Sequence, residues 1–169
     1  MLDESHANLN MTSEYARAPS SKRAVSSKPH CRGTTYSMIG AISTEGIEAM
    51  MYVEGSIDGH IFEEFVKKCL FPVLTPGKYL VLDNARIHRS HEVIKLIRST
   101  GAKIVFLPPY SPDFSPIENA WSKIKGKLKN LKARTTEEFA RAVKVAVKAV
   151  TGSDCEEWFE HCGYNVNGC

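Results

Sequence analysis

The sequence lacks the long apolar runs and paired cysteines that mark membrane-spanning and disulfide-bonded proteins. No stretch of about 18 apolar residues occurs, and the N-terminus has no basic start followed by an apolar stretch and a small-residue cleavage site. Its 5 cysteines are scattered and odd in number, and none forms a tight CxxC pair. We therefore expect reduced thiols, no zinc, no membrane partner and a cytoplasmic location.

Acidic residues are missing from one long segment. Between Asn119 and Thr136 there are six cations and no Asp or Glu, although the net charge of the chain is only 22 − 19 = +3. A local excess of cations attracts polyanions and makes their binding depend on salt. The alternative is a surface helix that is merely solvated. We favour a nucleic-acid-binding surface formed by Lys123, Lys125, Lys127, Lys129, Lys132 and Arg134.

The order of apolar segments predicts an α/β fold in a single domain, residues 1–169. A chain of 169 residues with 43% apolar content can bury one sizeable core. The apolar runs at 79–83 and 103–107 are typical of strands, and the helical pattern between them ends at Gly101. This arrangement predicts a parallel crossover. Residues 34–54 predict a β-hairpin with a short turn.

Helices are expected at four further places, the last of them a short helix around Trp158 and Phe159. Asp58 suits the N-cap of an amphipathic helix. An apolar stripe with steps of four and three residues predicts a second helix, and it consists of Ile117, Trp121, Ile124, Leu128 and Leu131. Thr135 and Glu138 form the pattern of a capping box, which predicts the start of another helix. Residues 5–33 are polar, without periodicity, and indicate a loop-rich connection.

Two carboxylates stand where a ligand or a metal is commonly held. Asp83 ends a strand, and ligands gather at the carboxyl ends of strands in open α/β sheets. Its alternative role is to cap the following turn. Glu118 lies in a first helical turn, which favours a carboxylate, but Ser115 and Glu118 also match a capping box, with Pro116 at the first helical position. Asp113 is a substitute candidate.

Other candidate residues flank these two acids. Asp3 and Glu4 form an acidic pair that, judged by position alone, would be solvated. Asn84 and His88 could orient water, a phosphate or a carboxylate, although a histidine in a loop is often only solvated. Carboxylates on separate segments suit Mg²⁺, and two such ions can clamp the attacking and leaving oxygens of a phosphodiester displacement.

Taken together, the motifs LDES, VLDNARIH and FLPPYSPDFSPIENAWSKIK resemble the DDE endonuclease domain of mariner-type transposases, in its bacterial insertion-sequence branch. The 34 residues between the second and third acids, 84–117, also match that family. The resemblance implies an RNase H-like fold, a mixed five-stranded sheet whose first three strands are antiparallel, with the first strand in the middle and helices on both faces. It implies that Asp3, Asp83 and Glu118 are catalytic and bind metal, with Glu4, Asn84, His88 and Asn119 as auxiliary residues.

The resemblance also implies a reaction and its partners. Two Mg²⁺ or Mn²⁺ ions would support cleavage of DNA by water and joining of the freed 3′ hydroxyl to target DNA. Element ends, target DNA, a second copy or a full-length transposase would be partners, in association with the nucleoid. The N-terminal helix-turn-helix region of the family is expected to be absent, and because only two residues precede Asp3, the first strand should be a stub.

Two alternatives follow from these expectations. A stubbed first strand would suit a catalytically inactive remnant that binds DNA or a partner transposase without cutting. Another RNase H-like nuclease, such as a junction resolvase, would share the metal chemistry and act on branched DNA.

Overall fold

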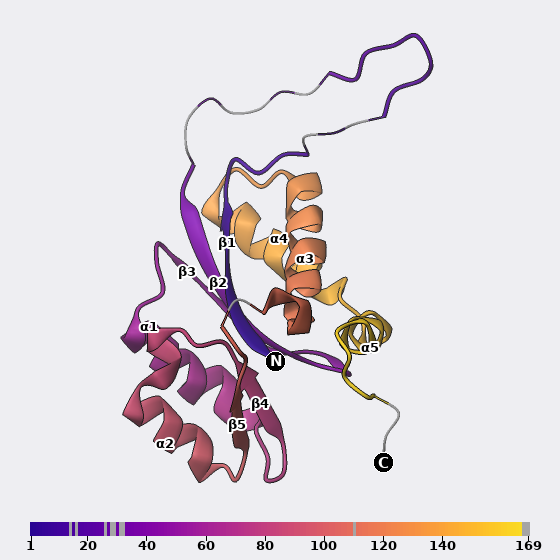
Figure 1. Ribbon diagram of the computed structural model, residues 1–169. Coiled ribbons are helices and arrows are strands. Elements are labelled where there is room, and N and C mark those ends of the chain that lie inside the picture. Colours follow the sequence, from indigo (N-terminus) through magenta and orange to yellow (C-terminus); the bar gives the residue numbers. More distant parts are fainter. Residues whose placement is uncertain are drawn as a thin grey trace.

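The computed structural model describes residues 1–13, 15, 17–25, 27, 30, 33–109 and 111–166. Within them, the first three strands form an antiparallel sheet in the order β1-β2-β3, and the last two form a parallel pair. On the side of β1 away from β2, β4 is the neighbouring strand (Figure 1). The strands are β1 (Leu2–Asn8), β2 (Thr35–Ser43), β3 (Gly46–Glu54), β4 (Tyr79–Leu82) and β5 (Lys103–Phe106).

The first strand is seven residues long, so the expectation of a stub was wrong. Asp3 is its second residue, and the strand extends on the C-terminal side through residues 5–8, which the polar pattern assigned to a loop. All its residues pair with β2. Antiparallel backbone pairing, rather than an apolar run, therefore specifies this strand.

The hairpin and the parallel crossover are as expected from the sequence. The turn between β2 and β3 ends at Gly46, whose φ of +131° lies in a region that favours glycine. Between β4 and β5, the helix α2 (His91–Ser99) is followed by Gly101 with φ +79°. The parallel register of β4 and β5 places their carboxyl ends side by side.

Three of the remaining helices begin where the local sequence predicts. Asp58 caps α1 (Gly59–Phe65) by accepting a 2.9 Å hydrogen bond from the backbone N–H of Ile61. Helical turns continue α1 through Val73. Thr135 and Glu138 form the expected capping box of α4. The helices of the C-terminal half are α3 (Ile117–Leu131), α4 (Thr136–Lys148) and α5 (Gly152–His161).

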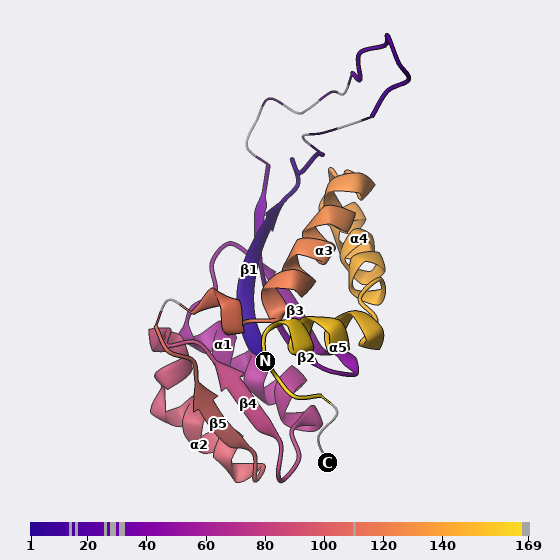
Figure 2. The same cartoon turned by 45° about the vertical axis from the view of Figure 1, so that its right-hand side comes forward.

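The core lies on both faces of the antiparallel sheet. Neighbouring residues of β2, Met38 and Ile39, are fully buried and belong to different apolar clusters, because successive side chains of a strand point to opposite faces. The cluster around Met38 includes Ile124 and Phe139 of α3 and α4, whereas the cluster around Ile39 includes Phe62 of α1. Helices α3 to α5 cover one face, and α1 and α2 cover the other (Figures 1 and 2).

The sequence led us to expect reduced thiols and no membrane-spanning segment. Cys69, Cys155 and Cys162 are free thiols, and Cys31 and Cys169 lie outside the described residues. Among the described helices, none has the length and apolar character needed to cross a membrane.

Candidate metal and nucleic-acid site

Three carboxylates from distant parts of the sequence line one pocket of about 390 Å³. Asp3 comes from β1, Asp83 directly follows β4, and Glu118 lies in the first turn of α3. The proline-rich segment before α3 forms another wall through Pro108, Pro109, Ser111 and Pro112. The fold thus brings together all three acids that the sequence singled out.

Asp3 is the most deeply placed of the three. Burial raises the pKa of its carboxyl to about 7, and the charges of Glu4, Glu118 and Asp83 act in the same direction. Its Oδ2 accepts a 3.2 Å hydrogen bond from Nε1 of Trp121. Asp3 is therefore held in the sheet rather than frayed at a chain end, as its position in the sequence had suggested.

Asp83 performs the turn-capping role and still reaches the pocket. Its Oδ1 accepts a 2.8 Å hydrogen bond from the backbone N–H of Ala85, as an Asp in such a turn commonly does. The same oxygen lies 2.6 Å from Nδ1 of His88. The side chain remains 54% exposed, so its other oxygen is available to a ligand in the pocket.

Glu118 does not serve as a capping residue. The helix α3 begins at Ile117 with Pro116 in the N-cap position, and no side-chain hydrogen bond caps it among the described residues. Ser115 contributes only its backbone carbonyl, which accepts from the N–H of Glu118 at 3.1 Å. The capping-box alternative was therefore wrong, and the exposed Glu118 carboxylate faces the pocket.

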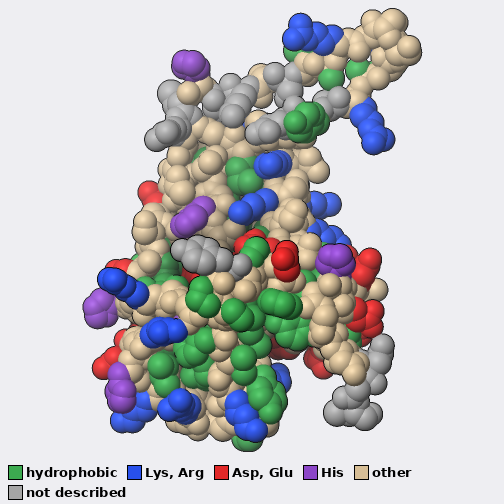
Figure 3. All heavy atoms as spheres, viewed as in Figure 1, with side chains coloured by type: hydrophobic (Ala, Val, Ile, Leu, Met, Phe, Trp, Pro, Cys, Tyr) green, Lys and Arg blue, Asp and Glu red, His purple; other side chains and the backbone are tan. Residues whose placement is uncertain are grey.

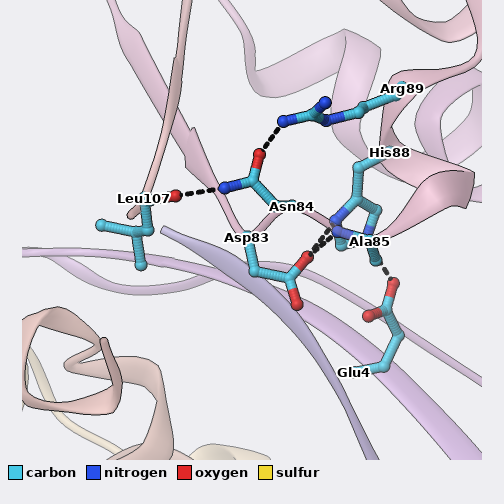
Figure 4. A network of polar contacts seen from close by, with 7 residues as sticks. All are labelled: Glu4, Asp83, Asn84, Ala85, His88, Arg89 and Leu107. Carbon is cyan, nitrogen blue, oxygen red and sulfur yellow. Dashed lines mark hydrogen bonds and ion pairs between the residues drawn. The ribbon is translucent and has the colours of Figure 1, made fainter. Parts of the chain in front are cut away.

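His88 is a buried link between the first and fourth strands rather than a solvated loop residue. Its side chain is 0% exposed, and its Nε2 lies 2.8 Å from Oε1 of Glu4 (Figure 4). Its Nδ1 faces Asp83 at ion-pair distance but out of line for a hydrogen bond. Burial alone would lower the pKa of His88, but the hydrogen bond to Glu4 and the charges of Glu4 and Asp83 raise it above the ordinary value.

Asn84 joins the ends of the two parallel strands. Its Nδ2 donates a 2.6 Å hydrogen bond to the backbone carbonyl of Leu107, and its Oδ1 accepts from the guanidinium of Arg89 (Figure 4). Asn84 also lines the pocket. Asn119, by contrast, is not among the described residues that line it.

The donor chemistry of the pocket fits a hard divalent cation. Carboxylate oxygens are what Mg²⁺ and Mn²⁺ prefer, and the mutual repulsion that helps raise the pKa of Asp3 is what a bound cation would relieve. In the part of the chain that the structure describes, however, no three His, Cys, Asp or Glu side chains already converge as a metal-binding cluster. The exposed carboxylates of Asp83 and Glu118 would have to turn toward Asp3.

The six cations expected to bind nucleic acid do not form one surface. Lys123 makes a 2.6 Å ion pair with Asp154 of α5, and Arg134 donates from Nη1 to the backbone carbonyls of Leu9 at 2.5 Å and Met11 at 3.3 Å. These two side chains stabilise the fold. The helical spacing of four places Lys125 and Lys129 along one flank of α3, and Lys127 lies on the other. Lys132 follows the last residue of the helix as its C-cap, in a left-handed conformation.

Charges of opposite sign lie close together on this side of the molecule. In Figure 3, a few Asp and Glu side chains lie near the middle of the face, with Lys and Arg side chains above them. A cluster of carboxylates beside cations suits a site that binds metal ions together with a phosphate backbone.

Sequence reasoning missed one contributor to the site, Trp121. It was assigned to the apolar stripe of α3, and its 2% exposure confirms that it is buried there. The available signal was its position three residues after Glu118, because residues three apart lie on the same side of a helix.

An α/β domain with acids from two adjacent strands and a later helix around one pocket has the arrangement of an RNase H-like fold. The family described as DDE superfamily endonuclease matches residues 1–140. The chain belongs to this family.

One curated relative is the Transposable element Tcb1 transposase of Caenorhabditis briggsae. It is 24% identical over 115 residues, which cover 66% of this chain and 42% of that protein. The chain therefore spans less than half the length of this relative.

Solved structures support the fold assignment. A Mos1 transposase paired-end complex with the left transposon end has a TM-score of 0.76 at 12% identity and covers 95% of this chain and 51% of that one. A Mos1 mariner paired-end complex with Mn has a TM-score of 0.73 at 13% identity, and the match covers 95% of this chain and 51% of that one. The catalytic domain of the Mos1 mariner transposase has a TM-score of 0.63 at 11% identity, and the match covers 76% of this chain and 69% of that one. The predicted RNase H-like fold is confirmed.

Proposed function

We propose that this chain is a transposase catalytic domain that cuts DNA strands and joins the freed 3′ hydroxyl to target DNA in a reaction that depends on Mg²⁺ or Mn²⁺. The observation that carries the proposal is the pocket lined by Asp3, Asp83 and Glu118. Family membership supports it, as does the fold shared with Mos1 structures that include a strand transfer complex.

The three carboxylates would hold two divalent ions, and the surrounding residues would fix the carboxylates. Bound there, the ions would supply positive charge to the scissile phosphate and to the attacking and leaving oxygens. Ala85 and His88 hold one oxygen of Asp83, and Trp121 holds one oxygen of Asp3. These contacts restrict the rotation of both carboxylates, so the site is partly preorganised.

DNA would follow the flank of α3 that carries Lys125 and Lys129, and would continue to Lys132 at the C-cap. Helical geometry places Glu118 on the same flank, about 10 Å along the axis from Lys125. From Lys125 to Lys132 is also about 10 Å, the length of roughly three nucleotides of one strand. The lysines would therefore bind consecutive phosphates of a strand whose next phosphates reach the carboxylates.

Plasmid nicking tests the proposal. The chain is incubated with supercoiled plasmid in Mg²⁺ or Mn²⁺, and Asp83→Asn and Glu118→Gln are compared with Asp113→Asn. Asp113 is an exposed acid near the pocket but not among the described residues lining it, so it is a matched control. We expect nicking by the wild type and Asp113→Asn, and loss of about 100-fold or more in the other two variants. Equal nicking by all four would refute the assignment.

The alternatives have less support than the transposase. The stub that motivated an inactive remnant is absent, because β1 has seven residues, and cleavage by the chain would exclude a remnant. A junction resolvase would cut branched DNA in preference to linear duplex, and comparing the two substrates separates it from a transposase.

The finer assignments are further proposals. Membership of the bacterial insertion-sequence branch, with action on nucleoid DNA, rests on the sequence motifs alone. Pairing with a second copy or a full-length transposase is suggested by the paired-end complexes of Mos1. We propose element ends and target DNA as the DNA partners.

A further inference from the structure

Trp121 connects the helix that carries Glu118 to the strand that carries Asp3. Its indole is 2% exposed, and Nε1 donates a 3.2 Å hydrogen bond to Oδ2 of Asp3. An indole N–H is a donor only, so this contact can be made only to an acceptor such as the carboxylate. The ring thus joins two elements of the site across the face of the sheet.

A glycine in the neighbouring strand makes room for this indole. Gly40 of β2 is the register partner of Asp3. A Cβ atom added at Gly40 would lie 3.0 Å from Cη2 of Trp121, closer than ordinary van der Waals contact. Glycine in a strand interior weakens the strand and commonly marks a close approach. Here the approaching group is the ring that bonds to Asp3.

We propose that Trp121 is a positioning residue for the metal site, with Gly40 supplying the space for it. By holding Oδ2, the indole fixes the rotation of the Asp3 carboxylate in the pocket shared with Asp83 and Glu118. The inference rests on the proposed function, because it assigns Trp121 to that same site. The competing interpretation is that Trp121 only fills the core.

Substitution by phenylalanine separates these two roles. Trp121→Phe keeps an aromatic ring in the core but removes the donor, and Trp158→Phe makes the same change at the other tryptophan, in α5. Mn²⁺ affinity is measured by titration calorimetry, and retention of the fold by circular dichroism. We expect affinity to fall about 10-fold in Trp121→Phe, as for other residues that orient a metal ligand, and to stay unchanged in Trp158→Phe.

A second variant and a fluorescence measurement distinguish a positioning role of Trp121 from a role in core packing alone. Gly40→Ala should displace the indole and weaken Mn²⁺ binding although Asp3 and Trp121 are both retained. In Trp158→Phe, Trp121 is the remaining indole. Its fluorescence emission should change when Mg²⁺ is added, with the midpoint that calorimetry with Mg²⁺ gives for the same variant.

The outcomes distinguish this inference from the function on which it rests. Metal affinity in folded Trp121→Phe equal to that of the wild type would overturn the positioning role and leave the metal site intact. Trp121 emission that does not respond to a metal that calorimetry shows to bind would overturn it as well. If the wild-type chain binds neither ion, the metal site fails, and the role of Trp121 fails with it.

Discussion

His88 and Glu4, 84 residues apart in the sequence, meet through a hydrogen bond of 2.8 Å between Nε2 and Oε1. His88 follows β4 and Glu4 lies in β1. The same imidazole faces Asp83 on its other side, so one buried ring holds together the two strands from which Asp3 and Asp83 reach the pocket. The geometry of the carboxylates therefore depends on His88.

Replacing His88 by alanine should destabilise the chain. The substitution leaves a cavity in the core and deprives Glu4 of its partner, which together should cost about 2 to 4 kcal/mol of unfolding free energy. Urea denaturation followed by circular dichroism measures it. His60→Ala is the matched control, because His60 is exposed on α1 and its loss should change stability by less than about 0.5 kcal/mol. Equal effects of the two substitutions would contradict the bridging role.

Asp3→Asn should make the metal-free chain more stable at neutral to alkaline pH. The pKa of Asp3 is about 7 in the folded chain against an ordinary 3.8, so the folded state binds a proton that the unfolded state releases. The contribution of Asp3 to stability is therefore highest below about pH 4, where Asp3 is protonated in both states. It falls as the pH rises through about 7, where the folded chain must also accept the charge. Asparagine carries no charge, so it avoids that loss.

The comparison requires unfolding curves in a chelator at two pH values. At about pH 8, Asp3→Asn should be more stable than the wild type, by an amount on the order of 2 kcal/mol, and at about pH 5 by much less. The same variant should lose Mg²⁺-dependent nicking. If Asp3→Asn were more stable than the wild type by the same amount at both pH values, or less stable at pH 8, the idea that the ionised carboxylate of Asp3 is partly buried would be contradicted.

Neutralising the lysine row of α3 should weaken DNA binding and its dependence on salt. In a variant with glutamine at Lys125, Lys129 and Lys132, the slope of log affinity against log salt should fall by about 0.9 for each phosphate that the protein no longer neutralises. Fluorescence anisotropy with a duplex at several salt concentrations measures the slope. Lys127→Gln alters the opposite flank and should leave the slope unchanged. A fall in Lys127→Gln about one third as large as that in the triple variant would show that the cations act only through total charge.

Local sequence signals predicted those parts of the site that depend on neighbouring residues. The strand ending at Asp83 and the capping box of Thr135 and Glu138 were identified correctly because periodicity and capping are local properties. The capping box proposed for Ser115 and Glu118 was wrong, since α3 begins at Ile117 without a side-chain cap among the described residues. A sequence match alone does not supply the backbone geometry that a cap requires.

The remaining features depend on contacts between distant residues. The polar residues 5–8 form a strand because β2 pairs with them, which no local pattern indicates. Likewise, Asp3 is partly buried through contacts with distant residues, among them Trp121, 118 residues later. The cations of α3 were expected to act together, but Asp154 binds Lys123 from a helix packed against α3.

The central claim is that Asp3, Asp83 and Glu118 bind divalent metal as one set, and anomalous diffraction from crystals grown with Mn²⁺ tests it most directly. The account predicts at least one Mn²⁺ bound by both Asp3 and Asp83, with oxygen distances of about 2.0 to 2.2 Å, and Glu118 turned into the pocket toward the ions. Mn²⁺ found only at other carboxylates, with the pocket free of anomalous signal at a saturating concentration, would contradict it.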